Sequence, residues 1–275
     1  MKKIIEMKKN IYLISIALAA LTIMSACKQK KPIDNTGDPE PPKVEEKFTG
    51  TVNVDVQNKI GTEDLVLEAQ ATGSARYIND NGDTFVVKEL KYYLSNFKLI
   101  GDGNDNYTIP ESYALVDELK TANTFTYQGI PAGKYKSLEL TIGVDSTRNV
   151  SGAQSGDLDP MLGMFWDWNT GYIMAKIEGF SSSIPTANQS LSIHIGGYHG
   201  DFNATRKVTI NLSQTLIVGD KTNSSITLNA DINKWFASPN KIDFSNFFLV
   251  SAIGPDAKTI ADNYQHMFVS NSVSN

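Results

Sequence analysis

Apolar and polar residues alternate along most of the chain from residue 48 onward. Val52, Val54 and Val56, for example, are separated by Asn53 and Asp55. A period of two is typical of strands that bury one face of a sheet. The pattern predicts strands over residues 52–57, 65–70, 85–100, 113–117, 124–130, 135–144, 172–177, 191–195, 207–212 and 225–230.

Turn-forming residues separate these predicted strands. Asp, Asn and Gly fill residues 80–83, and Pro-Ala-Gly fills residues 131–133. We also expect one helical turn over residues 231–236, with Asp231 as its N-cap, and a longer helix over residues 256–267. Many short strands without βαβ units predict an all-β fold. The expected architecture is an antiparallel β-sandwich with a long Trp-rich loop and a short C-terminal helix.

The N-terminal residues have the pattern of an export signal. Residues 1–10 contain four lysines, and residues 11–24 form an uncharged apolar run that is short for a membrane-spanning helix. The run ends in Met-Ser-Ala before Cys27, which resembles a bacterial lipobox. We therefore predict a lipoprotein signal peptide over residues 1–26 and a lipid anchor at Cys27. The alternative is an ordinary secretory signal with an incidental cysteine.

The next segment, residues 27–47, begins with the lipidated cysteine and is rich in proline and charge. Its few large apolar residues cannot offset the entropy of ordering, so a disordered tether is predicted. Lys28 does not resemble an inner-membrane retention signal, which favours the outer membrane, with the body facing either the periplasm or the surface. Residues 48–275 would then form the folded domain.

Charge and composition exclude several classes of function. The chain has 275 residues, with 25 Lys and Arg against 30 Asp and Glu, and a net charge of -5 argues against nucleic acid as a partner. One cysteine allows no intramolecular disulfide and no Cys-rich zinc site. Because no GxSxG, HExxH or phosphate-binding glycine loop is present, no enzyme is predicted.

Residues 143–179 differ in composition from the rest of the chain. A Gly-, Ser- and Asp-rich loop leads into Trp166, Trp168 and Tyr172, and long ordered loops are usually functional. Trp166 and Trp168 would share a face in a strand. One interpretation is a hydrophobic plug over one end of the sandwich. The other is an aromatic platform of Trp166, Trp168 and Tyr172 that binds a glycan or a peptide at the cell surface.

The same loop contains a set of acidic residues. Asp145, Asp157 and Asp159, together with backbone carbonyls, are candidate oxygen ligands for Ca²⁺. Their spacing does not follow the EF-hand pattern.

Two histidines form the second candidate site. His194 lies in the predicted strand 191–195, with its side chain opposite the apolar face, and the glycines at 196–197 let the chain bend so that His199 returns towards it. Two neutral imidazoles bind transition metals, and the Met164 thioether would favour Cu(I). The alternative is a hydrogen-bonded His194 beside a surface His199.

Several short motifs resemble those of a known family. The most specific is GMFWDWNTGY at residues 163–172, and shorter matches lie at residues 92–96, 113–117, 130–135, 142–145, 176–179 and 194–197. The chain is similar to the MbnP-like family, β-proteins related to the copper-binding partner protein of methanobactin gene clusters and to the MopE/CorA copper proteins of methanotrophs. The motifs cover the body from about residue 48 to its end.

The resemblance implies a β-sandwich that binds copper. In characterised relatives a tryptophan beside the His ligands of Cu(I) is oxidised to kynurenine by a di-haem partner of the MauG/cytochrome c peroxidase type. By position, the resemblance implies His194 as a ligand and Trp166 or Trp168 as the oxidised residue. Methanotroph members have a histidine two residues after the modified tryptophan. Trp168 stands there in this chain, which moves a ligand to His199 or Met164.

Overall fold

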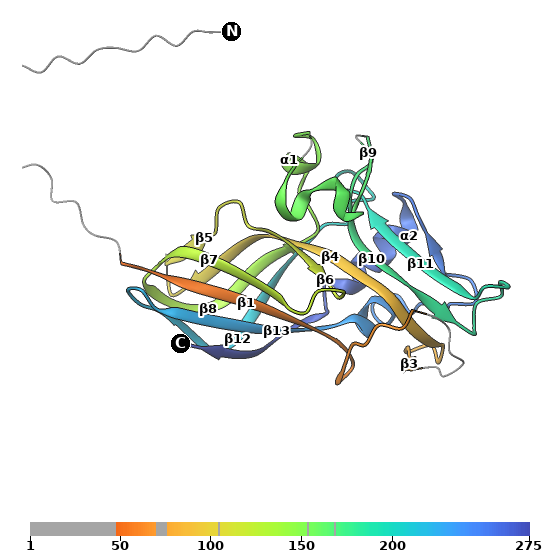
Figure 1. Ribbon diagram of the computed structural model, residues 1–275, viewed down its shortest axis with the longest axis horizontal. Helices are drawn as coiled ribbons and strands as arrows, with labels where there is room; N and C mark the ends of the chain where they lie inside the picture. Colours follow the sequence, from red (N-terminus) through yellow and green to blue (C-terminus); the bar gives the residue numbers. More distant parts are fainter. Residues whose placement is uncertain (1–47, 70–75, 104, 153, 168) are drawn as a thin grey trace, which may run out of the picture. The chain divides into compact units, whose positions relative to one another are not determined.

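The computed structural model describes residues 48–69, 76–103, 105–152, 154–167 and 169–275. The predicted signal peptide, Cys27 and the tether to residue 47 lie outside these residues, as does Trp168. The described chain is an all-β sandwich of two sheets, which confirms the predicted fold class (Figure 1). No helix among the described residues is long and apolar enough to cross a membrane.

The smaller sheet has five strands in the order β15-β13-β1-β2, with β7 also paired to β1. Its strands are β1 (Thr49–Ile60), β2 (Glu63–Asp64), β7 (Asn123–Pro131), β13 (Asn223–Asp231) and β15 (Phe268–Ser274). The β1–β13 pair is parallel, whereas the other pairs are antiparallel.

The larger sheet has ten strands, six of them in the order β12-β8-β4-β10-β11-β14. These six are β12 (Arg206–Val218), β8 (Gly133–Ile142), β4 (Thr84–Gly101), β10 (Gly171–Ser181), β11 (Ser190–Gly196) and β14 (Leu249–Val250). Four short strands are added at the sides: β3 (Tyr77–Ile78), β5 (Asn106–Thr108) and β6 (Tyr113–Asp117) on β4, and β9 (Phe165–Asp167) on β10. Only the β11–β14 pair is parallel.

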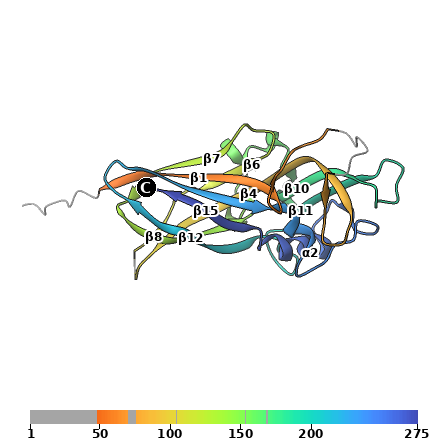
Figure 2. The ribbon, with the colours of Figure 1, turned by 90° about the horizontal axis from the view of Figure 1, so that it is seen from below.

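The core lies between the two sheets and follows the alternation in the sequence. Val52 and Val54 of β1 are fully buried, and so are Leu138 and Leu140 of β8. Figure 2 shows β12 beside β15, where the two sheets meet. A hydrogen bond joins the two strands here, from the Gln214 side-chain amide of β12 to the Val273 carbonyl of β15 at 2.7 Å.

The helical segments are short. They are α1 (Ser146–Asn149), η1 (Gly156–Leu158), η2 (Pro160–Leu162), η3 (Ile232–Phe236) and α2 (Pro255–Tyr264). Asp231 caps η3 as predicted, since its side chain accepts the Asn233 amide. Helix α2 ends three residues before the predicted limit of 267, because the chain turns there and enters β15.

Two expectations about strands were wrong. Residues 65–70 were expected to form a strand, but β2 ends at Asp64 and only a single bridge, Leu67 to Val87, follows. The sheets are also mixed rather than purely antiparallel. The parallel partners β1 and β13 are distant in sequence, so no hairpin dictates their direction.

Candidate functional site

His194 projects from the outer face of the larger sheet. It lies in β11 opposite Lys176 of β10, which in turn lies opposite Lys91 of β4. The neighbouring residues Ile193 and Ile195 are fully buried and face the core. Because side chains alternate across a strand, His194 and the two lysines share the face turned away from the smaller sheet.

An ionic network surrounds His194 on this face. The Lys176 Nζ lies 3.0 Å from Glu89 Oε1 and 3.6 Å from Glu178 Oε1. The Lys91 Nζ lies 3.5 Å from both Glu89 and Asp117. These side chains are between 13% and 23% exposed, so solvent and salt screen the charges less than on an open surface.

The nearest partner of His194 is the carboxylate of Glu178, with Nε2 and Oε1 3.0 Å apart. Burial alone would raise the pKa of Glu178, but the His194 hydrogen bond and the charges of Lys176 and Lys88 outweigh it and lower this pKa. An ionised carboxylate only accepts hydrogen bonds, so Nε2 of His194 is the donor. The lone pair of the neutral imidazole is therefore on Nδ1.

The aromatic loop, which contains Leu162 and Trp166, reaches the C-terminal end of β11, where His194 lies. Lys91 Nζ donates to the Leu162 carbonyl at 3.3 Å, which ties the loop to the ionic network. Trp166, in β9, is half-buried, and its Cζ3 lies 2.2 Å from the point that a Cβ on residue 196 would occupy. Only glycine at position 196 permits this contact. Since Gly196 follows His194 by two residues in the same strand, the indole lies against the face from which His194 projects.

Tyr172 is buried beneath the loop. It is 1% exposed, and its ring contacts Phe165 and Tyr93 with centroid separations of 5.0 and 5.6 Å. Its hydroxyl donates to the Leu158 carbonyl at 2.6 Å. Tyr172 is therefore not accessible to a ligand and packs as the plug interpretation expects, which removes it from the predicted aromatic platform. Trp168, another member of that platform, lies outside the described residues.

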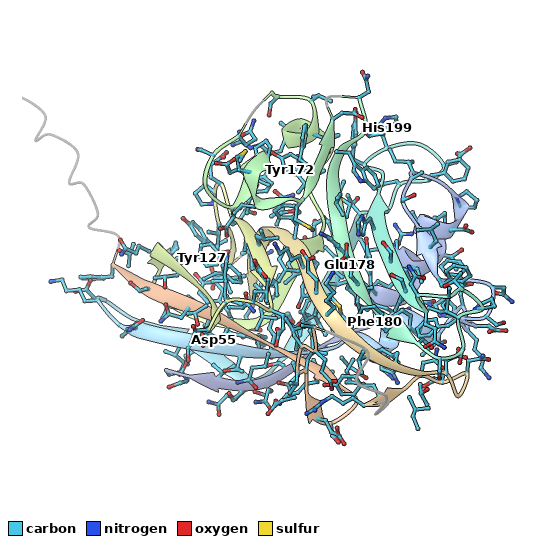
Figure 3. All side chains as sticks on the ribbon, turned by 45° about the vertical axis from the view of Figure 1, so that its right-hand side comes forward. Asp55, Tyr127, Tyr172, Glu178, Phe180 and His199 are labelled. Atoms are coloured by element: carbon cyan, nitrogen blue, oxygen red, sulfur yellow. The ribbon has the colours of Figure 1, made fainter. Side chains whose placement is uncertain are left out.

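His199 and Met164 do not join His194. The His194 ring is directed towards Glu178 and lies 3.5 Å from Ser192 Oγ, which precedes it in β11. The exposed His199 ring packs instead on Tyr198, and Figure 3 shows His199 apart from Glu178. Met164 is fully buried within the apolar core. The structure gives neither residue a contact with His194, and their role as copper ligands stays a prediction.

The three loop aspartates serve separate local roles. Asp145 caps α1 and accepts the Tyr113 hydroxyl at 2.7 Å. Asp157 accepts the Leu115 amide at 2.9 Å, and Asp159 caps η2. No three His, Cys, Asp or Glu side chains in the described part of the chain are grouped to hold a metal ion. The three carboxylates are therefore not grouped around a common point in the described structure.

Glu178 is the important residue that the sequence interpretation missed. Lys176 and Glu178 are polar positions between the buried Ala175, Ile177 and Gly179 neighbours of β10, and this alternation was visible in the sequence. Pairing with His194, however, depends on the antiparallel register of β10 and β11, which the pattern alone does not supply.

Comparison with known proteins agrees with the motifs in the sequence. The model of the MbnP family matches residues 49–256. Among solved structures, MbnP from Methylosinus trichosporium is similar, with a TM-score of 0.48 and 15% sequence identity, over 82% of this chain and 98% of that one. No curated protein sequence matches the chain. Because the family model covers most of the folded residues, the chain belongs to the MbnP family.

Proposed function

We propose that this protein is a lipid-anchored, cell-envelope protein that binds Cu(I) at His194, beside Trp166. The observation that supports it best is the arrangement of Glu178, His194 and Trp166. A carboxylate fixes one nitrogen of the imidazole, and an indole lies against the next position on the same face of β11. Family membership favours the same metal.

The donor chemistry fits copper in the reduced state. A neutral imidazole suits copper, and a hydrogen bond from its second nitrogen to a carboxylate is the usual arrangement around metal-binding histidines. Lys176 and Lys88 lie near Glu178. Their repulsion is weaker for a monovalent ion than for a divalent one, which favours Cu(I).

Each residue has a separate role in this proposal. His194 supplies the nitrogen ligand, Glu178 holds the tautomer and orientation of the ring, and Trp166 shields the site from water. Copper bound there would supply one-electron redox chemistry. Of the described residues, only His194 supplies an imidazole on this face of the sheet, so His194 is the residue on which binding depends.

Replacement of Glu178 by glutamine tests the role of the carboxylate. We expect Cu(I) affinity to fall roughly tenfold to 100-fold, the usual cost of changing a residue that orients a metal ligand. Competition with a chromogenic Cu(I) chelator measures the change. Glu89→Gln is the matched control, because it removes the same charge from the same network without contacting His194. Equal losses in both variants would contradict an orienting role for Glu178.

We also propose that a di-haem protein of the MauG/cytochrome c peroxidase type oxidises Trp166. The indole is half-buried at the C-terminal end of β11, where a partner can approach its exposed part. Peptide mass spectrometry should find kynurenine at Trp166 in protein from its own bacterium and tryptophan in protein from a host without the partner. Unmodified tryptophan in both samples would contradict this.

A further inference from the structure

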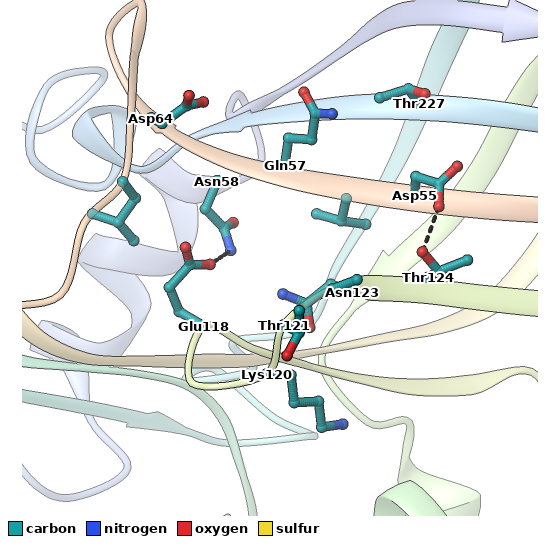
Figure 4. Close-up of a pocket in the computed structure, with 13 residues that line it drawn as sticks. Asp55, Gln57, Asn58, Asp64, Glu118, Lys120, Thr121, Asn123, Thr124 and Thr227 are labelled. Atoms are coloured by element: carbon teal, nitrogen blue, oxygen red, sulfur yellow. Dashed lines mark hydrogen bonds between the residues drawn. The ribbon is translucent and has the colours of Figure 1, made fainter.

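A cavity of about 430 Å³ opens between β1 and the connection from β6 to β7 (Figure 4). Among the described residues, its wall consists mainly of carboxylate, amide and hydroxyl side chains and includes no aromatic residue. Figure 3 shows Asp55, which lines the cavity, apart from Glu178 of the copper site. A volume of this size is sufficient for a small molecule.

Glu118 is one of three carboxylates that line the cavity among the described residues. Of the other two carboxylates, Asp64 is paired with Lys59, and Asp55 accepts the Thr124 hydroxyl. The one lysine of the wall, Lys120, points away from Glu118 in Figure 4. Its Nζ instead donates to the Leu115 carbonyl at 3.3 Å and lies 4.0 Å from Asp157. No ion pair joins Glu118 to a cation among the described residues.

Glu118 is held in place by a buried amide. Asn58, only 5% exposed, donates from Nδ2 to Glu118 Oε2 at 2.7 Å. The Tyr92 hydroxyl donates to Asn58 Oδ1, also at 2.7 Å, and so fixes the orientation of the amide. Burial raises the pKa of Glu118 despite the Asn58 hydrogen bond, and the charges of Asp117 and Asp64 raise it further. The fold thus holds the Glu118 carboxylate in a partly buried position without a counter-ion among the described residues. Such an unfavourable placement of a charged group is common at functional sites.

A second buried amide offers an unused donor. Asn123 is 8% exposed and lines the cavity. Its Oδ1 accepts the Asp117 amide at 2.9 Å, whereas its Nδ2 has no hydrogen-bond acceptor among the described residues. This donor is open to the cavity, where a ligand oxygen can accept its hydrogen bond in place of water.

We infer that this cavity binds a small, hydroxylated organic ammonium ion of the amino-sugar class. The ammonium group pairs with Glu118, and a hydroxyl or carbonyl oxygen of the ligand accepts a hydrogen bond from Asn123. The hydroxyl of Thr121 and the amide of Gln57 suit further hydroxyl groups of such a molecule. This site does not depend on copper or on His194.

Calorimetric titration of the protein with glucosamine at neutral pH, and with uncharged glucose for comparison, tests the inference. We expect saturable binding of glucosamine and at least about tenfold weaker binding of glucose, because only glucosamine carries the ammonium group. The variant Glu118→Gln should lose about tenfold or more in glucosamine affinity. Asp201→Asn, the same charge change on an exposed turn, should bind as the parent does.

The Glu118→Gln variant should also fold, since glutamine can still accept the Asn58 hydrogen bond and no longer repels Asp117 and Asp64. Its unfolding midpoint is expected to equal or exceed that of the parent. Equal binding of the two sugars, no binding of glucosamine, or undiminished binding to Glu118→Gln would each overturn the inference. So would amide chemical shifts that place bound glucosamine away from residues 118–124.

Discussion

Replacement of His194 by alanine is expected to abolish stoichiometric Cu(I) binding. The imidazole is the only one on its face of β10 and β11 in the described chain, and Glu178 fixes its tautomer so that Nδ1 presents the lone pair. Its removal leaves no nitrogen ligand beside Trp166. The fall in affinity should exceed the roughly 10–100-fold cost of disturbing an orienting residue. Competition with a Cu(I) chelator under anaerobic conditions measures it.

His199→Ala is the matched control for this experiment. The exposed His199 ring packs on Tyr198 rather than approaching Glu178, so its loss should leave Cu(I) affinity within about twofold of the parent value. Comparable losses in both variants would show that the two histidines act together in solution, although they make no contact in the structure. An unchanged affinity in His194→Ala would remove the proposed site.

Replacement of Cys27 by serine should move the protein from the membrane to the soluble envelope fraction. Serine cannot accept the thioether-linked lipid that the lipobox resemblance implies. Each buried CH₂ contributes about 0.8 kcal/mol, so several acyl chains give stable attachment, whereas a protein without them has only weak contacts with the bilayer. Fractionation of cells followed by immunoblotting measures the distribution.

Copper binding provides the control for the Cys27→Ser variant. Residues 28–47 of the predicted tether separate Cys27 from the folded domain. The soluble variant should therefore bind Cu(I) as the parent does. A variant that remains in the membrane pellet after an alkaline wash would show that the anchor is not at Cys27.

Alternation of apolar residues was sufficient to locate most of the sandwich. The buried valines of β1 and leucines of β8 lie where the period of two predicts. The same signal failed at residues 65–70, where Leu65 is buried but the chain has no continuous strand partner. Strand β15 went unpredicted because it is rich in serine and, of its seven residues, buries only Val273.

The candidate site was predicted in part. His194 and Trp166 were identified from the sequence, and the structure places both at one end of β11. The packing of His199 and Met164 was not predicted, because a bend at glycines does not fix where a following side chain points, and a thioether is equally suited to an apolar core. The contact between Glu178 and His194 could not be predicted from the sequence, because it depends on the register between β10 and β11.

Whether this protein binds copper is decided by the copper content of protein purified from its own bacterium. Elemental mass spectrometry should find about one copper per chain, and the native source ensures that any partner required to modify Trp166 is present. Protein without copper, even after anaerobic loading with Cu(I), would contradict copper binding at His194 and would show that the MbnP fold serves another purpose here.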